Sequence, residues 1–369
     1  MVDARASAVR YADDMVESPF LPAWSRHAVR LAEYRGAWTA GEWLESPSAR
    51  LPDALARGAV LYDWSWRSRL RAAGSDTRGW LNGMVTGNVR DLAVGQSVPA
   101  FLLNAKGRIL GQLEVVAHDR DEFWILTDAT NSATLYRELE RFIVMEEIEF
   151  EDRSASLATL GVRGATARRV LETLGLPPLP TAAGDWMSCP ATRWGDLEIR
   201  FRALPGPVVA QIQCETFEVS VAPEHAVALW EALEREAVAL PAMLQEQDRI
   251  LSGLPLFGVD IRSTELPQET EQLQNLHFAK GCYLGQEIVE RIRSRGNVHR
   301  RFGGFLFTGP VTAGEKLVKD GADVGELTSV APLADGRCWA LGYIRRELGG
   351  RGAPVATKTS TGEFVPLAP

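Results

Sequence analysis

The sequence has few cysteines, and no two of them are close together along the chain. They stand at positions 189, 214, 282 and 338. No CxxC element exists, which excludes a zinc ribbon and a thioredoxin-type redox motif. Cys189, Cys214 and Cys338 are expected to be reduced and structural, because isolated cysteines in a cytoplasmic protein usually pack as small apolar residues. Only Cys282 has neighbours that indicate chemistry.

Long apolar runs are also missing. Charged side chains interrupt the first thirty residues repeatedly, from Asp3 to Glu17 and beyond, so the start does not resemble a secretory signal. No segment approaches the roughly 20 apolar residues of a membrane-spanning helix. The run at 237–244 is short and contains Pro241. We therefore expect a cytoplasmic protein with no membrane segment.

The composition is that of an ordinary globular protein, but its charge is unevenly distributed. With 369 residues, of which 46% are hydrophobic and 24% charged, the chain should form two or three domains. Its net charge of −8 argues against a surface that binds nucleic acid generally. Between Lys280 and Arg301, however, six basic residues stand against two acidic ones. This segment is either a solvated helix face or an anion site for a carboxylate or phosphate ligand.

The order of β-rich and helical patterns predicts an α+β protein. Residues 1–50 form an N-terminal lead-in, 51–177 a first α+β lobe that binds the ligand, and 178–297 a second α+β lobe. The division between the two lobes is placed at the proline-rich stretch Pro177–Pro180. Residues 298–369 carry Asp-Gly turn signals between short alternating runs, which predicts a small all-β barrel.

The segment KGCYLGQE at 280–287 places a thiol among polar groups and glycines. Apolar residues recur every four positions from Leu284 to Ile292, so Cys282 is predicted to lie in the first turn of an amphipathic helix. There the free backbone N–H groups, together with Lys280, would favour the thiolate. The alternative is an inert buried cysteine, and the local chemistry alone does not decide between them.

Several motifs occur in an order that resembles one family. They are RILSGLPLFGVD at 249–260, LPQE at 266–269 and the segment 296–301, together with KGCYLGQE. This order is similar to that of the YgfZ-type folate-binding proteins, relatives of the glycine-cleavage T-protein aminomethyltransferases. WLNGMVTGNV at 80–89 and NAKGRI at 104–109 extend the resemblance over most of the chain. KGCYLGQE is the most specific of these motifs.

The resemblance implies a three-lobed GcvT/YgfZ-like body with a central channel for tetrahydrofolate, or its 5,10-methylene or 5-formyl derivative. By analogy, Glu269 receives the pterin. A carboxylate suits this role, since it accepts two N–H donors from a 2-amino-4-oxo pteridine edge, although Glu269 taken alone would be read as a surface carboxylate. The other predicted binding residues are Gln268, Lys280, Tyr283, Arg291 and Arg301, with Arg300 as a further candidate for the folate tail.

Departures from the family decide the predicted function. After Gly107 the aminomethyltransferases carry an aspartate pair, where this chain has Gly111 and Gln112; where they have another aspartate, it has Cys282. Loss of a carboxylate and gain of a thiol point away from glycine cleavage and toward thiol or one-carbon redox chemistry. Cys282 and Lys280 are therefore the predicted reactive residues.

The predicted function is that of a tetrahydrofolate-binding accessory protein for iron–sulfur cluster assembly or repair, and for tRNA modification that depends on such clusters. Its partners would be folate and iron–sulfur client or assembly proteins. The alternative is a folate-dependent one-carbon (aminomethyl) transferase or demethylase. Direct tRNA contact through the basic segment is ranked last, because the chain is acidic and has no RNA-binding motif. No metal is predicted: pairing Cys282 with His277 or His299 is less expected than polar packing of these histidines.

Overall fold

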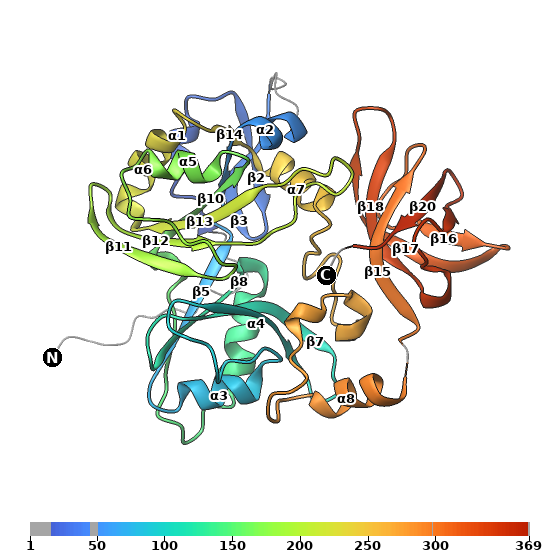
Figure 1. The fold of residues 1–369 in the computed structure, drawn as a ribbon, viewed down its shortest axis with the longest axis horizontal. Helices are drawn as coiled ribbons and strands as arrows, with labels where there is room; N and C mark the ends of the chain where they lie inside the picture. Colours follow the sequence, from blue (N-terminus) through green and yellow to red (C-terminus); the bar gives the residue numbers. More distant parts are fainter. Residues whose placement is uncertain (1–15, 45–50, 297, 368–369) are drawn as a thin grey trace.

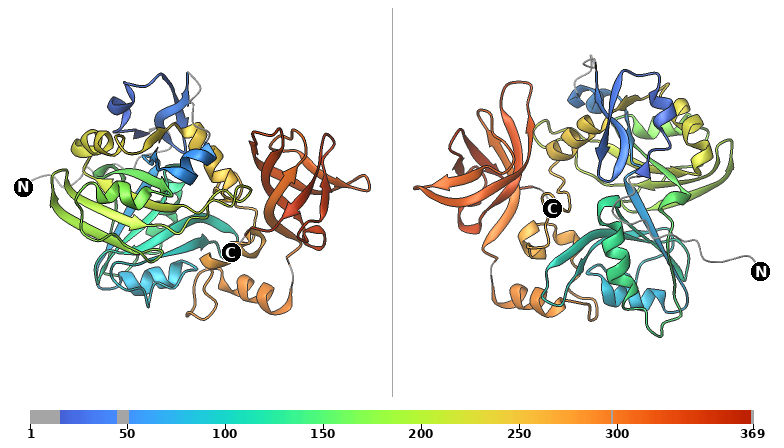
Figure 2. Two further views of the ribbon diagram at one scale, coloured as in Figure 1. Left: turned by 45° about the horizontal axis from the view of Figure 1, so that its top comes forward. Right: turned by 180° about the vertical axis from the view of Figure 1, so that it is seen from behind.

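The computed structural model describes residues 16–44, 51–296 and 298–367. These residues form three lobes (Figure 1), and Figure 2 shows from two further directions that the C-terminal lobe stands beside the other two. The predicted α+β architecture with three lobes and a C-terminal β-barrel is confirmed. Among the described residues, no helix has both the length and the apolar character that crossing a bilayer requires.

The upper lobe in Figure 1 contains a six-stranded sheet covered on its outer face by helices. Its strands, in spatial order, are β11 (Trp186–Thr192), β12 (Gly195–Phe201), β13 (Glu215–Val221), β10 (Ala158–Gly164), β4 (Val60–Asp63) and β14 (Val238–Leu240). Its helical elements are α1 (Leu21–Trp24), α2 (Leu51–Arg57), α5 (Ala167–Glu172), η2 (Pro223–His225), α6 (Ala226–Leu233) and α7 (Ala242–Leu251). Leu171 of α5 and Trp230 of α6 pack in the core with Leu197 and Ile199 of β12.

The N-terminal lead-in packs on this lobe. Its strands β1 (Val16–Glu17), β3 (Ala37–Trp43) and β2 (Val29–Tyr34) form a small sheet. Phe20 and Trp24 are buried in the same core as Trp230. The prediction for residues 1–15 and 45–50 lies outside the described residues.

The lower lobe contains a five-stranded antiparallel sheet with helices on its outer face. In spatial order its strands are β6 (Ser97–Leu103), β7 (Ile109–Ala117), β8 (Glu122–Asp128), β5 (Arg67–Ala73) and β9 (Glu149–Asp152), with α3 (Thr77–Met84), α4 (Ala129–Glu140) and η1 (Ser154–Ser156). Leu81 of α3 and Leu135 of α4 belong to its core. The inner faces of the upper and lower sheets meet in a polar seam, where Arg69 of β5 pairs with Glu198 of β12.

The chain contributes strands first to the upper sheet, then to the lower sheet, and then to the upper sheet again. It enters the upper sheet at β4, builds the whole lower sheet, and returns at β10. The predicted division at residues 177 and 178 therefore falls between β10 and β11, which belong to one sheet. The proline-rich stretch marks a connection within the upper lobe, because strand pairing between distant segments leaves no signal in local composition.

A linking segment leads to the barrel through η3 (Pro267–Thr270), η4 (Leu273–Asn275) and α8 (Gln286–Arg295). The barrel strands, in spatial order, are β16 (Lys316–Lys319), β17 (Ala322–Pro332), β18 (Cys338–Arg345), β15 (Arg300–Phe307), β20 (Thr361–Val365) and β19 (Pro354–Ala356), with η5 (Arg346–Leu348) between β18 and β19. β16 and β19, at the two ends of this order, also approach each other, which nearly closes the barrel. Its interior is filled by aromatic and aliphatic residues such as Phe305 and Phe364.

Candidate functional site: a thiol loop, a joint and a charged seam

Cys282 is exposed and lies before α8, not within it. The helix begins at Gln286, so the predicted position of Cys282 in the first helical turn is wrong. Gly285 caps the helix in the left-handed conformation, with φ of +80°. A Cβ atom there would lie 2.6 Å from the Asn104 carbonyl oxygen. Close approach to the lower lobe therefore requires glycine at this position and delays the helix.

Lys280 is directed toward the turn after α3. Its Nζ donates hydrogen bonds to the carbonyl oxygens of Val85 (2.6 Å) and Gly87 (2.5 Å). Burial, and then the nearby Arg90 guanidinium, lower the pKa of the Lys280 amine to about 7. Both carbonyl contacts place this group against the backbone of the lower lobe. Because the amine contacts these carbonyl oxygens, the role of Lys280 as a cation for the thiol stays a prediction.

Cys282 lines an open groove on the surface. The other lining residues are Gly83, Met84, Ala105, Phe142, Tyr283, Leu284, Gly285, Gln286 and Glu287. Of the other predicted binding residues, only Tyr283 belongs to this set. The Tyr283 side chain is buried in an apolar cluster with Leu103 and Val289, and its hydroxyl has no partner within the described structure. Burial, with a smaller effect of Glu290, raises the pKa of Tyr283 to about 12.

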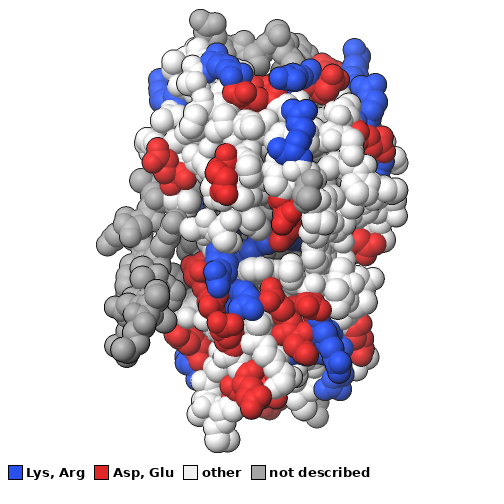
Figure 3. Space-filling view, turned by 90° about the vertical axis from the view of Figure 1, so that its left-hand side faces the viewer, with Lys and Arg blue, Asp and Glu red and all other residues white. Residues whose placement is uncertain are grey.

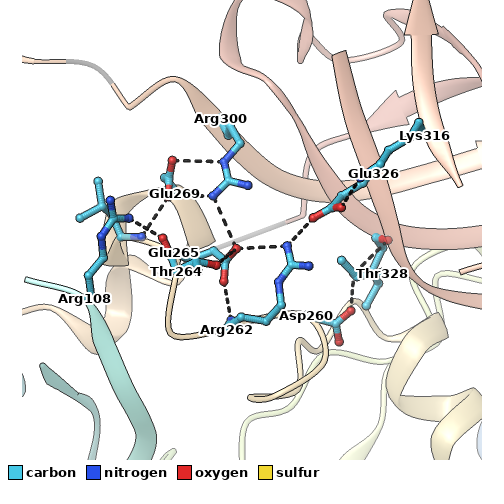
Figure 4. A network of polar contacts seen from close by, with 12 residues as sticks. Arg108, Asp260, Arg262, Thr264, Glu265, Glu269, Arg300, Lys316, Glu326 and Thr328 are labelled. Atoms are coloured by element: carbon cyan, nitrogen blue, oxygen red, sulfur yellow. Dashed lines mark hydrogen bonds and ion pairs between the residues drawn. The ribbon is translucent and has the colours of Figure 1, made fainter. Parts of the chain in front are cut away.

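Glu269 is buried and has partners within the chain (Figure 4). Its carboxylate accepts a hydrogen bond from the Leu266 backbone N–H at 2.9 Å, which caps η3. It also accepts bonds from Nε and Nη2 of Arg300 in β15, at 3.3 and 3.2 Å. A ligand that used this carboxylate would have to displace Arg300, so pterin binding by Glu269 stays a prediction.

Glu269 belongs to a polar joint that connects the lobes. Figure 4 shows its contacts, and its members are Arg108, Asp260, Arg262, Thr264, Glu265, Glu269, Arg300, Glu326 and Thr328. Arg108 of the lower lobe donates to the Thr264 carbonyl oxygen, and Arg262 pairs with Glu326 of the barrel. Glu265 is fully buried and pairs with Arg262 at 3.1 Å. The joint thus ties the linking segment to the lower lobe and to the barrel.

The remaining predicted binding residues do not converge on Cys282. Arg301 donates to the Gly349 carbonyl oxygen and pairs with Glu271, at 3.0 and 3.1 Å. Gln268 donates to the Val289 carbonyl oxygen at 2.9 Å. Arg291 is exposed on α8. Their assignment to a folate site stays a prediction.

Sequence reasoning missed a charged cluster in the seam between the two sheets. The seam cluster consists of Arg67, Glu114, Arg200, Arg202 and Glu218, all with little exposed side-chain surface. Arg200 pairs with Glu114 at 3.0 Å and with Glu218 at 2.9 Å, and Arg202 pairs with Glu218 at 2.8 Å. Three guanidinium groups thus face two carboxylates, which leaves one positive charge in excess. Arg200 Nε is buried with no partner among the described residues.

The arginines of the seam cluster keep its carboxylates ionised. Burial alone would raise the pKa of Glu218, but Arg200, Arg67 and Arg202 outweigh it and lower the pKa to about 2. The same guanidinium groups outweigh burial at Glu114 and lower its pKa well below its usual range.

One sequence signal marks part of the seam cluster. In β12 and the residue that follows it, charged residues at 198, 200 and 202 alternate with apolar residues at 197, 199 and 201, which predicts a strand with one polar face but not that this face is buried. The seam continues into a narrow hollow lined by Arg69, His118, Trp124, Trp186, Glu198, Arg200, Glu218 and Ser220, among others. Figure 3 views this side, where basic and acidic side chains gather around a hollow at mid-height.

A side chain at position 111 would overlap two side chains of α4. Gly111 lies in β7 beneath α4, and a Cβ atom would lie 2.3 Å from Asn131 Nδ2 and 2.6 Å from Leu135 Cδ2. Real Cβ atoms essentially never show contacts below 3.0 Å. An aspartate at this position would therefore require the side chains of Asn131 and Leu135 to shift.

Comparison with known proteins identifies the family. The model of the GCVT N-terminal domain matches residues 33–275, more than half of the chain. The chain belongs to the GCVT family. The tRNA-modifying protein YgfZ of Klebsiella pneumoniae (strain 342) is 30% identical over 68% of this chain and 71% of the relative. An aminomethyltransferase of Thermoanaerobacter sp. (strain X514) is 23% identical over 79% of this chain and 78% of the relative.

A solved structure agrees with this assignment. The glycine cleavage system aminomethyltransferase T from Bartonella henselae superposes with a TM-score of 0.83 over 96% of this GCVT-family chain and 97% of that one. Because the two sequences are only 19% identical, this similarity shows the shared fold alone. The predicted resemblance to YgfZ-type proteins and to aminomethyltransferases is confirmed, and the family includes both. Within the described part of the chain, no group of three or more histidine, cysteine or acidic residues could hold a metal ion.

Proposed function

We propose that this GCVT-family chain is a cytoplasmic tetrahydrofolate-binding accessory protein that supports iron–sulfur cluster assembly or repair, and thereby cluster-dependent tRNA modification. Family membership supports the folate part of the proposal. The relative named as a tRNA-modifying protein supports the link to tRNA modification. The iron–sulfur clients would be reached through the exposed thiol of Cys282.

Gly111 is the observation that favours an accessory protein over an aminomethyltransferase. The resemblance aligns this position with the aspartate pair that serves the transferases. Here the residue is glycine, and a Cβ atom would lie 2.3 Å from Asn131 Nδ2 and 2.6 Å from Leu135 Cδ2, so a carboxylate would displace both side chains. Without that carboxylate, the acid–base step expected of a transferase lacks its group. The chain offers an exposed thiol instead.

We place the proposed anchor of the ligand at the seam cluster, where the ligand would have to displace ion pairs between the arginines and the carboxylates. A folate brings two carboxylates on its tail and a row of N–H donors on its pterin edge. The seam cluster offers cations in excess for carboxylates, and carboxylates for N–H donors. Arg202 is its most accessible member, with 20% of its side chain exposed. Glu269 in the joint is the alternative carboxylate for the pterin, with tetrahydrofolate or its 5,10-methylene or 5-formyl derivative as the ligand.

Calorimetric titration with tetrahydrofolate tests the ligand and its place. Wild type should bind, and Arg202→Ala should weaken binding about tenfold or more, because it removes a charge-assisted hydrogen bond. Arg351→Ala is the matched control, since this exposed arginine lies outside both the seam cluster and the set of predicted binding residues. Loss of binding in Glu269→Ala, with Arg202→Ala unchanged, would move the site to the joint. No binding by wild type would refute the proposal.

Cys282→Ser tests the role of the thiol in a strain that lacks the gene. The variant should restore folate binding but leave iron–sulfur enzyme activity low. Full restoration of client activity would remove the thiol from the proposed function.

One observation favours the second candidate, a folate-dependent one-carbon transferase or demethylase. The Lys280 amine, with its pKa lowered to about 7 by burial and Arg90, can exchange a proton near neutral pH. Such an enzyme would transfer the carbon of an aminomethyl thioether donor to tetrahydrofolate, which forms methylene-tetrahydrofolate and releases ammonia and the free thiol. Absence of turnover in protein that binds folate would exclude it.

A further inference from the structure

The loop that carries Cys282 lies along the turn after α3. At one end, the His277 N–H donates to the Thr86 carbonyl oxygen at 3.0 Å. At the other end, the Leu284 N–H donates to the Gly83 carbonyl oxygen, also at 3.0 Å. Two segments almost 200 residues apart in sequence, both parts of motifs that carry the family resemblance, are thus joined in one structure.

Between these attachments the loop is held by one side chain. Within the described structure, residues 279–282 make no hydrogen bond except through Lys280, whose Nζ contacts the Val85 and Gly87 carbonyl oxygens. Cys282 is two residues away, so its Cα lies at most about 7 Å from that of Lys280. Fixing the amine therefore restricts where the thiol can lie in the groove.

We infer that Lys280 is a positioning residue, which holds the Cys282 loop on the turn after α3 by donating to two backbone carbonyls. The inference rests on the proposed function only in what the Cys282 thiol is held in place to do. The attachment of the loop through Lys280 does not depend on that function. The Lys280 Nζ lies 5.2 Å from the centre of the Tyr283 ring, which adds a contact within the loop.

The ionisation of Lys280 gives this attachment a recognisable pH dependence. Arg90 is the charged group that acts on the Lys280 amine, and the uncharged ring of Tyr283 lies beside it. Burial and Arg90 lower the pKa from 10.5 to about 7, whereas an opened loop would return the amine to water and to its ordinary pKa. Between about pH 7 and 10.5 the amine is neutral in the closed loop and protonated in the open loop. Opening therefore takes up a proton, and it becomes less favourable as the pH rises above about 7. The neutral amine still has two N–H donors for the two carbonyls.

Hydrogen exchange of the full chain, measured by mass spectrometry on peptides spanning 276–285, tests the inference. Lys280→Met should accelerate exchange about tenfold or more, since two buried carbonyls lose their donor. Lys280→Arg should restore part of the protection, because a guanidinium can donate to both carbonyls. Lys106→Met, a change at an exposed lysine of the neighbouring lower-lobe loop, should have no effect.

The pH profile separates positioning from general destabilisation. After correction for intrinsic exchange, loop opening in wild type should decrease by up to tenfold per pH unit above about 7. Both Lys280 variants should lose this slope, because neither side chain titrates in this range. Unchanged protection in Lys280→Met, or the wild-type slope in Lys280→Arg, would overturn the inference. No folate or client is present in this assay, so its failure and that of the proposed function are distinguishable.

Discussion

Gly111→Ala should destabilise the protein, because a methyl group at this position would overlap two buried side chains of α4. The new Cβ would lie 2.3 Å from Asn131 Nδ2 and 2.6 Å from Leu135 Cδ2. Both atoms belong to side chains of α4, so relief of the clash requires these buried side chains, or the helix that carries them, to shift. Overpacking of this kind costs about 1–3 kcal/mol. Gly111→Asp should cost more, since it also buries a carboxylate.

The assay is equilibrium unfolding in urea, with Gly79→Ala as the matched control. Gly79 is exposed within α3, and a Cβ atom there would meet nothing within 4 Å. This change should leave the protein unaffected or stabilise it by about 0.4–1 kcal/mol. Equal midpoints for wild type and Gly111→Ala would refute the reasoning that this position excludes a carboxylate.

Further predictions concern charge and burial. Arginines lower the pKa of Glu218 from 4.5 to about 2, so its contribution to stability should be present above about pH 4.5 and be lost as the pH falls toward 2. In Glu218→Gln the melting temperature should therefore depend less on pH over this interval than it does in wild type. Cys282→Ser should change the free energy of unfolding by no more than about 0.5 kcal/mol, whereas Cys189→Ser, in the core, should cost about 1–3 kcal/mol. Tyr283→Phe removes a buried hydroxyl without a partner and should be neutral or stabilising by up to about 1 kcal/mol in urea unfolding. A marked loss of stability would contradict the last prediction.

The sequence allowed the family and the three-lobed architecture to be predicted, because both depend on local motifs. KGCYLGQE and the ordered segments around it carry the resemblance, and the Asp-Gly turns marked the barrel strands. The division between the first two lobes could not be read this way. It depends on β4 pairing with β10 across the whole lower lobe, and such pairing has no local signal.

The start of α8 was misplaced for a similar reason. Apolar periodicity extended the helix back to Cys282, but the contact of Gly285 with Asn104, far away in sequence, forces a left-handed residue there. The orientation of Lys280 is also set by distant groups, the carbonyls of Val85 and Gly87. The residue types of the site were thus predictable, whereas their partners required the fold.

Titration of tetrahydrofolate into the wild-type protein and the Arg202→Ala variant tests the central claim most directly. The account predicts saturable binding to wild type that weakens about tenfold or more when Arg202 is removed from the seam cluster. It would be contradicted by a wild-type protein that is folded and takes up no tetrahydrofolate.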